Sequence, residues 1–157
     1  FNNPSLSQYV GLGYNWRMST LTAALGISQL QKLDKIIKMR KENAQYLSNS
    51  LSKISQIRVP NPPAGYEHIY QMYTIRLENE KIRDDLHNFL TKKEIFSKVY
   101  FHPIHKTQFY TKFNTDNKLP VTEMIASQVL TIPLYPNMTK EEKEYLTNSI
   151  MEFFESR

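Results

Sequence analysis

The sequence predicts an α+β fold, in which a long N-terminal helix precedes a small, mostly antiparallel three-stranded sheet with helices. Three observations support this prediction. The chain has 157 residues, enough to bury the core of one domain. An apolar stripe with steps of three and four residues runs through residues 30–54, as on one face of a helix. Segments rich in β-branched and aromatic residues then alternate with amphipathic segments, as in a small α+β layer.

Residues 1–18 are predicted as a loop and residues 19–56 as one long helix. Ser19 is a suitable N-cap, because its hydroxyl can accept a hydrogen bond from a backbone N–H of the first turn. Gly26 is expected to mark either a bend or a place of close packing. The helical pattern covers about 36 residues, which at 1.5 Å per residue span roughly 54 Å, more than the roughly 40 Å diameter of a compact chain of this length. One end is therefore expected to project beyond its own domain. The stripe comprises Leu30, Leu33, Ile37, Arg40, Ala44, Leu47, Leu51 and Ile54.

Residues 57–157 are predicted to form the α+β part. The three expected strands are 68–77, 96–101 and 129–132, and Ile57–Val59 is a further short candidate. Helices are expected from Asn79 to about residue 93, over 121–127, and from the capping box Thr139–Glu142 onward.

Composition and charge exclude several classes of protein. Hydrophobic residues make up 40% of the chain and charged residues 22%, as in ordinary globular proteins. No apolar run reaches the roughly 18 residues of a membrane span, so we expect a soluble protein without a membrane partner. The net charge of +5 is scattered, which argues against a nucleic-acid partner. The chain begins at Phe1 without the features of a signal peptide, which favours an internal or processed segment.

The histidines and glycines limit the chemistry further. His102 and His105 are spaced so that both could bind a metal, but no third ligand is evident and the chain has no cysteine, so we predict no metal site. One of them contacts substrate, or both are ordinary loop histidines. Four glycines are too few for a glycine-rich phosphate loop. Glu123 is expected on a solvated helix face, and no serine–histidine–acid set can be selected.

Asn15 and Arg17 form the most suggestive pair. They lie on a loop just ahead of a predicted helix N-terminus. An amide donor, a guanidinium and a helix dipole together favour an anion such as a phosphate or a carboxylate. Alternatively, Asn15 closes a turn and Arg17 pairs with a local carboxylate. The residues alone leave these alternatives open.

Several motifs resemble those of one enzyme family. The run Gly13-Tyr-Asn-Trp-Arg-Met-Ser19, followed by Ala23-Ala-Leu-Gly26, Gln29-Leu30, Leu33-Asp34 and Arg40, resembles the DegT/StrS nucleotide-sugar aminotransferases. Val99-Tyr-Phe-His-Pro-Ile-His105 resembles the strand and substrate loop of that family. Ile132-Pro-Leu-Tyr-Pro136 with Met138-Thr139 resembles its last strand and helix cap. Trp16 stands where many relatives have tyrosine.

The resemblance implies a fold and a cofactor. These relatives are cytoplasmic homodimers that bind pyridoxal 5′-phosphate, adopt the fold type I architecture of aspartate aminotransferase and serve polysaccharide biosynthesis. Residues 1–18 would lead from the large domain, 19–56 would be the linking helix, and 57–157 the C-terminal small domain. The large domain, which carries the lysine that binds the cofactor covalently, would lie upstream of Phe1. No catalytic residue is therefore assigned in this chain, and we expect the chain alone to be inactive.

The resemblance also implies roles for three residues. Asn15 matches an asparagine that reaches across the dimer to the cofactor phosphate, and Arg17 matches a nearby arginine with a supporting or substrate-facing role. His105 matches a histidine that approaches the nucleotide-sugar. The expected activity is transfer of an amino group from an amino acid such as glutamate to a keto nucleotide-sugar. The alternatives are a pyridoxal-phosphate sugar dehydratase of the same family and a non-catalytic binding or regulatory domain.

Overall fold

The computed structural model describes residues 11–113 and 118–157, and the predicted loop over residues 1–10 lies outside this range. The chain divides into two compact units after Leu33. The first unit contains a non-helical segment and helix α1 (Thr20–Leu30), which carries no buried side chain. Ser19 is the N-cap of α1, as predicted, and its Oγ accepts a hydrogen bond from the backbone N–H of Thr22 at 3.2 Å.

The single helix predicted over residues 19–56 is two helices in the structure. Helix α1 ends at Leu30, and helix α2 runs from Leu33 to Leu51. Between them, the N–H of Lys32 donates to the carbonyl of Gln29, three residues earlier, at 3.0 Å. This tighter 3₁₀-type bond replaces the α-helical bond across four residues, and α1 ends there. Asp34 lies in the first turn of α2, where a carboxylate favours a helix start. The bend expected at Gly26 is therefore wrong, since Gly26 lies within α1. The alternative of close packing is wrong as well, because a Cβ at Gly26 would meet no described atom within 4 Å.

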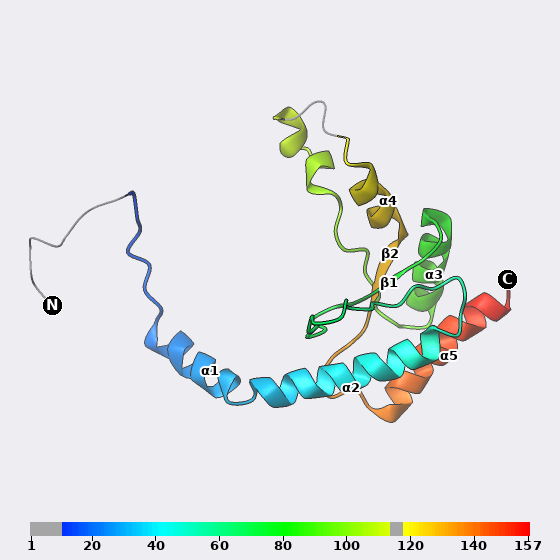
Figure 1. Cartoon of the computed structure of the whole chain (residues 1–157), viewed down its shortest axis with the longest axis horizontal. Helices are drawn as coiled ribbons and strands as arrows, with labels where there is room; N and C mark the ends of the chain where they lie inside the picture. The colour runs from blue at the N-terminus through cyan, green and yellow to red at the C-terminus, as the bar shows by residue number, and fades with distance from the viewer. Residues whose placement is uncertain (1–10, 114–117) are drawn as a thin grey trace, which may run out of the picture. The chain divides into compact units, whose positions relative to one another are not determined.

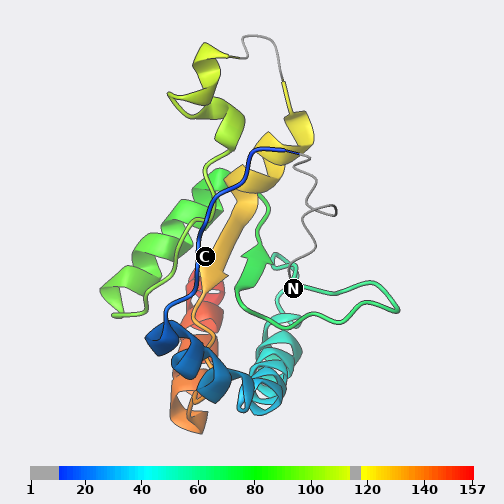
Figure 2. The same cartoon turned by 90° about the vertical axis from the view of Figure 1, so that its left-hand side faces the viewer.

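The second unit contains a two-stranded antiparallel sheet. Strand β1 (Tyr73–Arg76) pairs with β2 (Val129–Ile132), with Tyr73 opposite Ile132 and Arg76 opposite Val129. The two strands lie side by side (Figures 1 and 2). The α+β class and the antiparallel pairing are confirmed.

The third strand predicted over 96–101 is reduced to a single bridge between Lys98 and Thr131. The pairing does not extend beyond this bridge, because the next hydrogen-bonding positions opposite the segment are Pro133 and Val129. Pro133 has no N–H to donate. The N–H of Val129 already donates to the carbonyl of Ile125.

The candidate strand Ile57–Val59 is likewise one bridge, between Arg58 and Arg76. Pro60 follows it and cannot donate the next ladder hydrogen bond. Of the predicted strand segments, only β1 and β2 extend far enough to be strands in the described residues.

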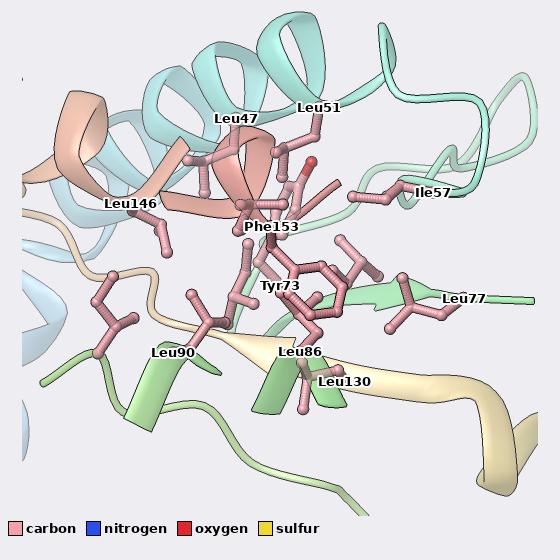
Figure 3. Close-up of a cluster of buried hydrophobic side chains, with 14 of the residues drawn as sticks. Leu47, Leu51, Ile57, Tyr73, Leu77, Leu86, Leu90, Leu130, Leu146 and Phe153 are labelled. Atoms are coloured by element: carbon pink, nitrogen blue, oxygen red, sulfur yellow. The ribbon is translucent and has the colours of Figure 1, made fainter. Parts of the chain in front are cut away.

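Three helices of the second unit supply the core together with the sheet. They are α2, α3 (Glu80–Lys92), which Asn79 caps, and α5 (Lys140–Glu155), which begins with the predicted capping box of Thr139 and Glu142. Figure 3 shows side chains of these helices converging on the sheet. The largest fully buried side chains are Tyr73, Leu47, Leu51, Ile75, Leu86, Leu90, Leu130, Ile132, Ile150 and Thr147.

The connection from the bridge at Lys98 to β2 carries the aromatic and basic segment. It contains two short 3₁₀ turns, Ile104–Lys106 and Tyr110–Lys112, and helix α4 (Pro120–Gln128), which begins with a proline that needs no donor there. Figure 1 shows the two 3₁₀ turns lying away from the core, and α4 leading directly into β2. No helix in the described ranges is long and apolar enough to span a membrane.

Candidate functional site

Asn15 and Arg17 form a small polar cluster directly before α1. The guanidinium Nε of Arg17 donates a hydrogen bond to Oδ1 of Asn15 at 3.0 Å. The alternate side chains of this segment, Tyr14 and Trp16, stack on each other with ring centroids 4.9 Å apart. Because residues of an extended segment alternate in direction, the polar pair and the aromatic pair are separated onto different sides.

The hydrogen bond determines which atoms of the cluster remain as donors. Oδ1 of Asn15 accepts from Arg17, the amide nitrogen of Asn15 keeps its N–H donors, and Arg17 keeps the N–H groups of its terminal nitrogens. Among the ion pairs of residues 11–113 and 118–157, none includes Arg17. The local carboxylate that the alternative interpretation requires is therefore not found in the described range. The cluster is an exposed donor set with the chemistry to hold a phosphate.

His105 lies in the second unit, in the 3₁₀ turn that follows Pro103. Its Nε2 lies 3.0 Å from Oε1 of Glu123, and its side chain is 14% exposed. The second oxygen of Glu123 pairs with Nζ of Lys106 at 2.6 Å. The backbone N–H of Leu119 also donates to Glu123, at 3.3 Å. One carboxylate thus fixes the imidazole, a cation and the start of α4.

The contacts of Glu123 keep it ionised. The hydrogen bond from Lys106, followed by that from His105, lowers the pKa of the Glu123 carboxyl from 4.5 to about 2. The prediction of a solvated helix face for Glu123 is correct only in part, because its side chain is 30% exposed but pairs with Lys106 and His105. No sequence signal marked this contact, because Glu123 is 18 residues from His105 along the chain and the segment between them has no clear period.

A largely apolar hollow with a volume of about 480 Å³ lies beside His105. Aromatic and aliphatic side chains form most of its wall, and its polar groups include the two histidines. This size is in the usual range for small-molecule sites. Its lining residues are Phe101, His102, Pro103, Ile104, His105, Tyr110, Phe113, Leu119 and Thr122. The arrangement can hold a ring against apolar walls while an imidazole contacts a polar group.

The described residues do not make a metal centre. No group of three or more histidine, cysteine, aspartate or glutamate side chains that could hold a metal ion occurs in residues 11–113 and 118–157. Of the predicted site residues, Asn15 and Arg17 are brought together in the first unit, and His105 lies in the second unit with Glu123 and Lys106.

Two other family motifs of the sequence have structural contacts. Arg40 of α2 donates from Nη1 to the backbone carbonyls of Tyr70 and Gln71, at 2.8 and 3.1 Å, and so fixes the turn before β1. The buried Asn43 donates to the carbonyls of Tyr135 and Pro136 at 2.8 and 3.1 Å. These contacts anchor the loop after β2 to α2.

Comparison with known proteins identifies the family. The model of the DegT/DnrJ/EryC1/StrS aminotransferase family matches residues 2–151. A GDP-perosamine synthase of Escherichia coli O157:H7 is 27% identical over 93% of this chain, which covers 39% of that protein. A pleiotropic regulatory protein of Geobacillus stearothermophilus is 28% identical over 91% of this chain, again covering 39% of the relative. The chain thus spans about two fifths of the length of these relatives.

Solved structures share the fold. The aminotransferase TlmJ from Streptoalloteichus hindustanus superimposes with a TM-score of 0.84 at 22% identity, covering 98% of this chain and 42% of that structure. The fold, the sequence motifs and the family match agree, and the chain belongs to the DegT/DnrJ/EryC1/StrS aminotransferase family.

Proposed function

We propose that this chain works as the C-terminal part of a homodimeric, pyridoxal-phosphate-dependent aminotransferase. The enzyme transfers an amino group from an amino acid such as glutamate to a keto nucleotide-sugar. In this proposal, residues 1–18 lead from a large domain, α1 and α2 form the link, and residues 57–157 form the small domain. The nucleotide-sugar in the name of the relative from Escherichia coli supports the substrate class.

The observation that carries the proposal is the donor set of Asn15 and Arg17. Arg17 donates to Oδ1 of Asn15, which leaves the amide N–H groups of Asn15 and the terminal N–H groups of Arg17 available as donors on one side of the loop. Amide and guanidinium donors fit the phosphate of the cofactor, and we propose that they bind it in the active site of the partner subunit. When bound, pyridoxal phosphate supplies the electron sink for moving the amino group.

His105 is proposed to contact the nucleotide-sugar. Glu123 holds one nitrogen of the ring at 3.0 Å, so the ring is orientated before any ligand arrives. The apolar wall beside it supplies contact area for a sugar or base ring and excludes water from it. Orientation by a carboxylate reduces the entropy that the side chain loses on binding.

A regulatory protein without catalytic activity is the second candidate. The name of the relative from Geobacillus stearothermophilus favours it. The two proposals differ at Asn15 and Arg17, because a protein that does not use the cofactor has no need of their donors.

Cofactor affinity tests the proposal. A hydrogen bond to a charged group contributes about 1.5–3 kcal/mol, so Asn15→Ala in the intact enzyme is expected to weaken binding of pyridoxal phosphate roughly 10- to 150-fold. Asn49→Ala changes an exposed asparagine elsewhere in the chain, on α2. It is the matched control and should leave the affinity for pyridoxal phosphate unchanged. Lower stability with unchanged affinity per folded molecule would show that Asn15 only closes a turn.

A further inference from the structure

A polar hollow with a volume of about 280 Å³ lies beside the ends of β1 and α4. It shares no lining residue with the hollow beside His105. Its polar wall is formed by Ser55, Gln56, Arg58, Arg76, Glu78 and Gln128. Two of these residues are arginines, and the proposed function uses neither of them.

Arg58 and Arg76 are held directly opposite each other. The N–H of each residue donates to the carbonyl of the other, at 2.8 and 2.9 Å, which makes them a hydrogen-bonded antiparallel pair. Side chains of such a pair project from the same face of the sheet. Their neighbours Ile57, Ile75 and Leu77 are buried, so both guanidinium groups project from the opposite face. Like charges in this arrangement destabilise the pairing.

The guanidinium of Arg76 is also fixed in place. Its Nε donates to Oε1 of Gln128 at 2.7 Å, and Nε2 of Gln128 donates to the backbone carbonyl of Glu78 at 2.7 Å. Within residues 11–113 and 118–157, no carboxylate forms an ion pair with Arg58 or Arg76. Two neighbouring guanidinium groups therefore share a hollow, and Gln128 orientates one of them through hydrogen bonds. The Glu78 carboxylate also lines this hollow, but it forms an ion pair with neither arginine in the part of the chain that the structure describes.

We infer that Arg58 and Arg76 form a binding site for a phosphoryl dianion. A dianion bound between the two guanidinium groups offsets their repulsion, and it would lie on the side of the arginines away from the Glu78 carboxylate. Guanidinium groups bind phosphate oxygens through two parallel N–H donors, and the planar fork of Arg76 is already set by Gln128. Phosphomonoesters carry close to two negative charges at neutral pH. The ligand is thus inorganic phosphate or the terminal phosphate of a small phosphorylated molecule.

Nuclear magnetic resonance of the whole chain tests this inference. The Nε–Hε signals of the arginines and the side-chain amide of Gln128 are followed during titration with inorganic phosphate, glycerol phosphate or succinate. Sodium chloride holds the ionic strength constant. Saturable shifts at Arg58, Arg76 and Gln128 with the phosphates are expected. Tighter binding of glycerol phosphate assigns the site to a phosphorylated molecule, and equal binding assigns it to free phosphate.

Two variants separate a site from general charge attraction. Arg58→Gln removes one guanidinium from an exposed side chain and is expected to weaken phosphate binding by about tenfold or more. Lys53→Gln removes the same charge from an exposed position that does not line the hollow, and should leave binding unchanged. Backbone amide spectra confirm that both variants are folded. Absence of saturable shifts, equal binding of succinate, or equal weakening by both variants would overturn the inference.

Discussion

Replacement of Asn43 by leucine tests the contact between α2 and the loop after β2. The Asn43 side chain is 4% exposed and makes three hydrogen bonds. It donates to the carbonyls of Tyr135 and Pro136, and its Oδ1 accepts from Nζ of Lys143 at 3.1 Å. A net contribution of about 0.5–1.5 kcal/mol for each gives an expected loss of about 1.5–4.5 kcal/mol in the free energy of unfolding.

Urea unfolding followed by circular dichroism measures this loss. Asn49→Leu is the matched control, because it makes the same substitution at an exposed site of the same helix. It is expected to change stability by no more than about 0.5 kcal/mol. If the slope of the unfolding free energy against urea concentration is the same in both variants and the unchanged chain, the substitutions have altered stability and not the compactness of the native state. Equal effects of the two substitutions would refute the role assigned to the buried amide.

Three further predictions follow from burial and charge. Leu47→Ala, at a fully buried site, should destabilise the chain by about 2–5 kcal/mol in urea unfolding, whereas Leu25→Ala, at a site 62% exposed, should have little effect. The pKa of Glu123 is lowered from 4.5 to about 2, so its contribution to stability is present above pH 4.5 and is lost as the pH falls toward 2. In the Glu123→Gln variant, the free energy of unfolding should therefore fall less steeply as the pH decreases from 4.5 toward 2. An unchanged pH dependence would contradict this. Hydrogen exchange should be faster in α1, which buries no side chain, than in the last two turns of α2.

The local signals of the sequence predicted much of the fold. Ser19, Asn79 and Thr139 were predicted from residue type as helix starts, and each side chain accepts the expected hydrogen bond. Val129–Ile132 has the predicted bounds of a strand. These features depend on residues within a few positions of each other, which is why they can be predicted from a single sequence.

Features that depend on distant partners were not predictable in the same way. The segment at Lys98 has the composition of a strand, but it forms only one bridge. Pro133 has no N–H to donate to it, and the N–H of Val129 already donates to the carbonyl of Ile125. The break at Gln31–Lys32 has no glycine or proline to mark it.

In the candidate site, too, contacts between near neighbours were predictable and contacts between distant residues were not. Asn15 and Arg17 are two positions apart and were recognised as a pair, whereas the carboxylate that orientates His105 comes from another helix.

Subunit mixing tests the central claim, that Asn15 serves the cofactor of the partner subunit. One subunit of the intact enzyme carries Asn15→Ala, and the other lacks the lysine that binds the cofactor covalently. If Asn15 acts across the dimer, each heterodimer collects both defects in one active site and leaves the other intact. At a pyridoxal phosphate concentration that leaves the Asn15→Ala homodimer mostly unloaded, transaminase activity in purified heterodimers should then rise well above that of either parent homodimer. Activity that stays as low as in the parents would show that Asn15 does not act on the partner's site.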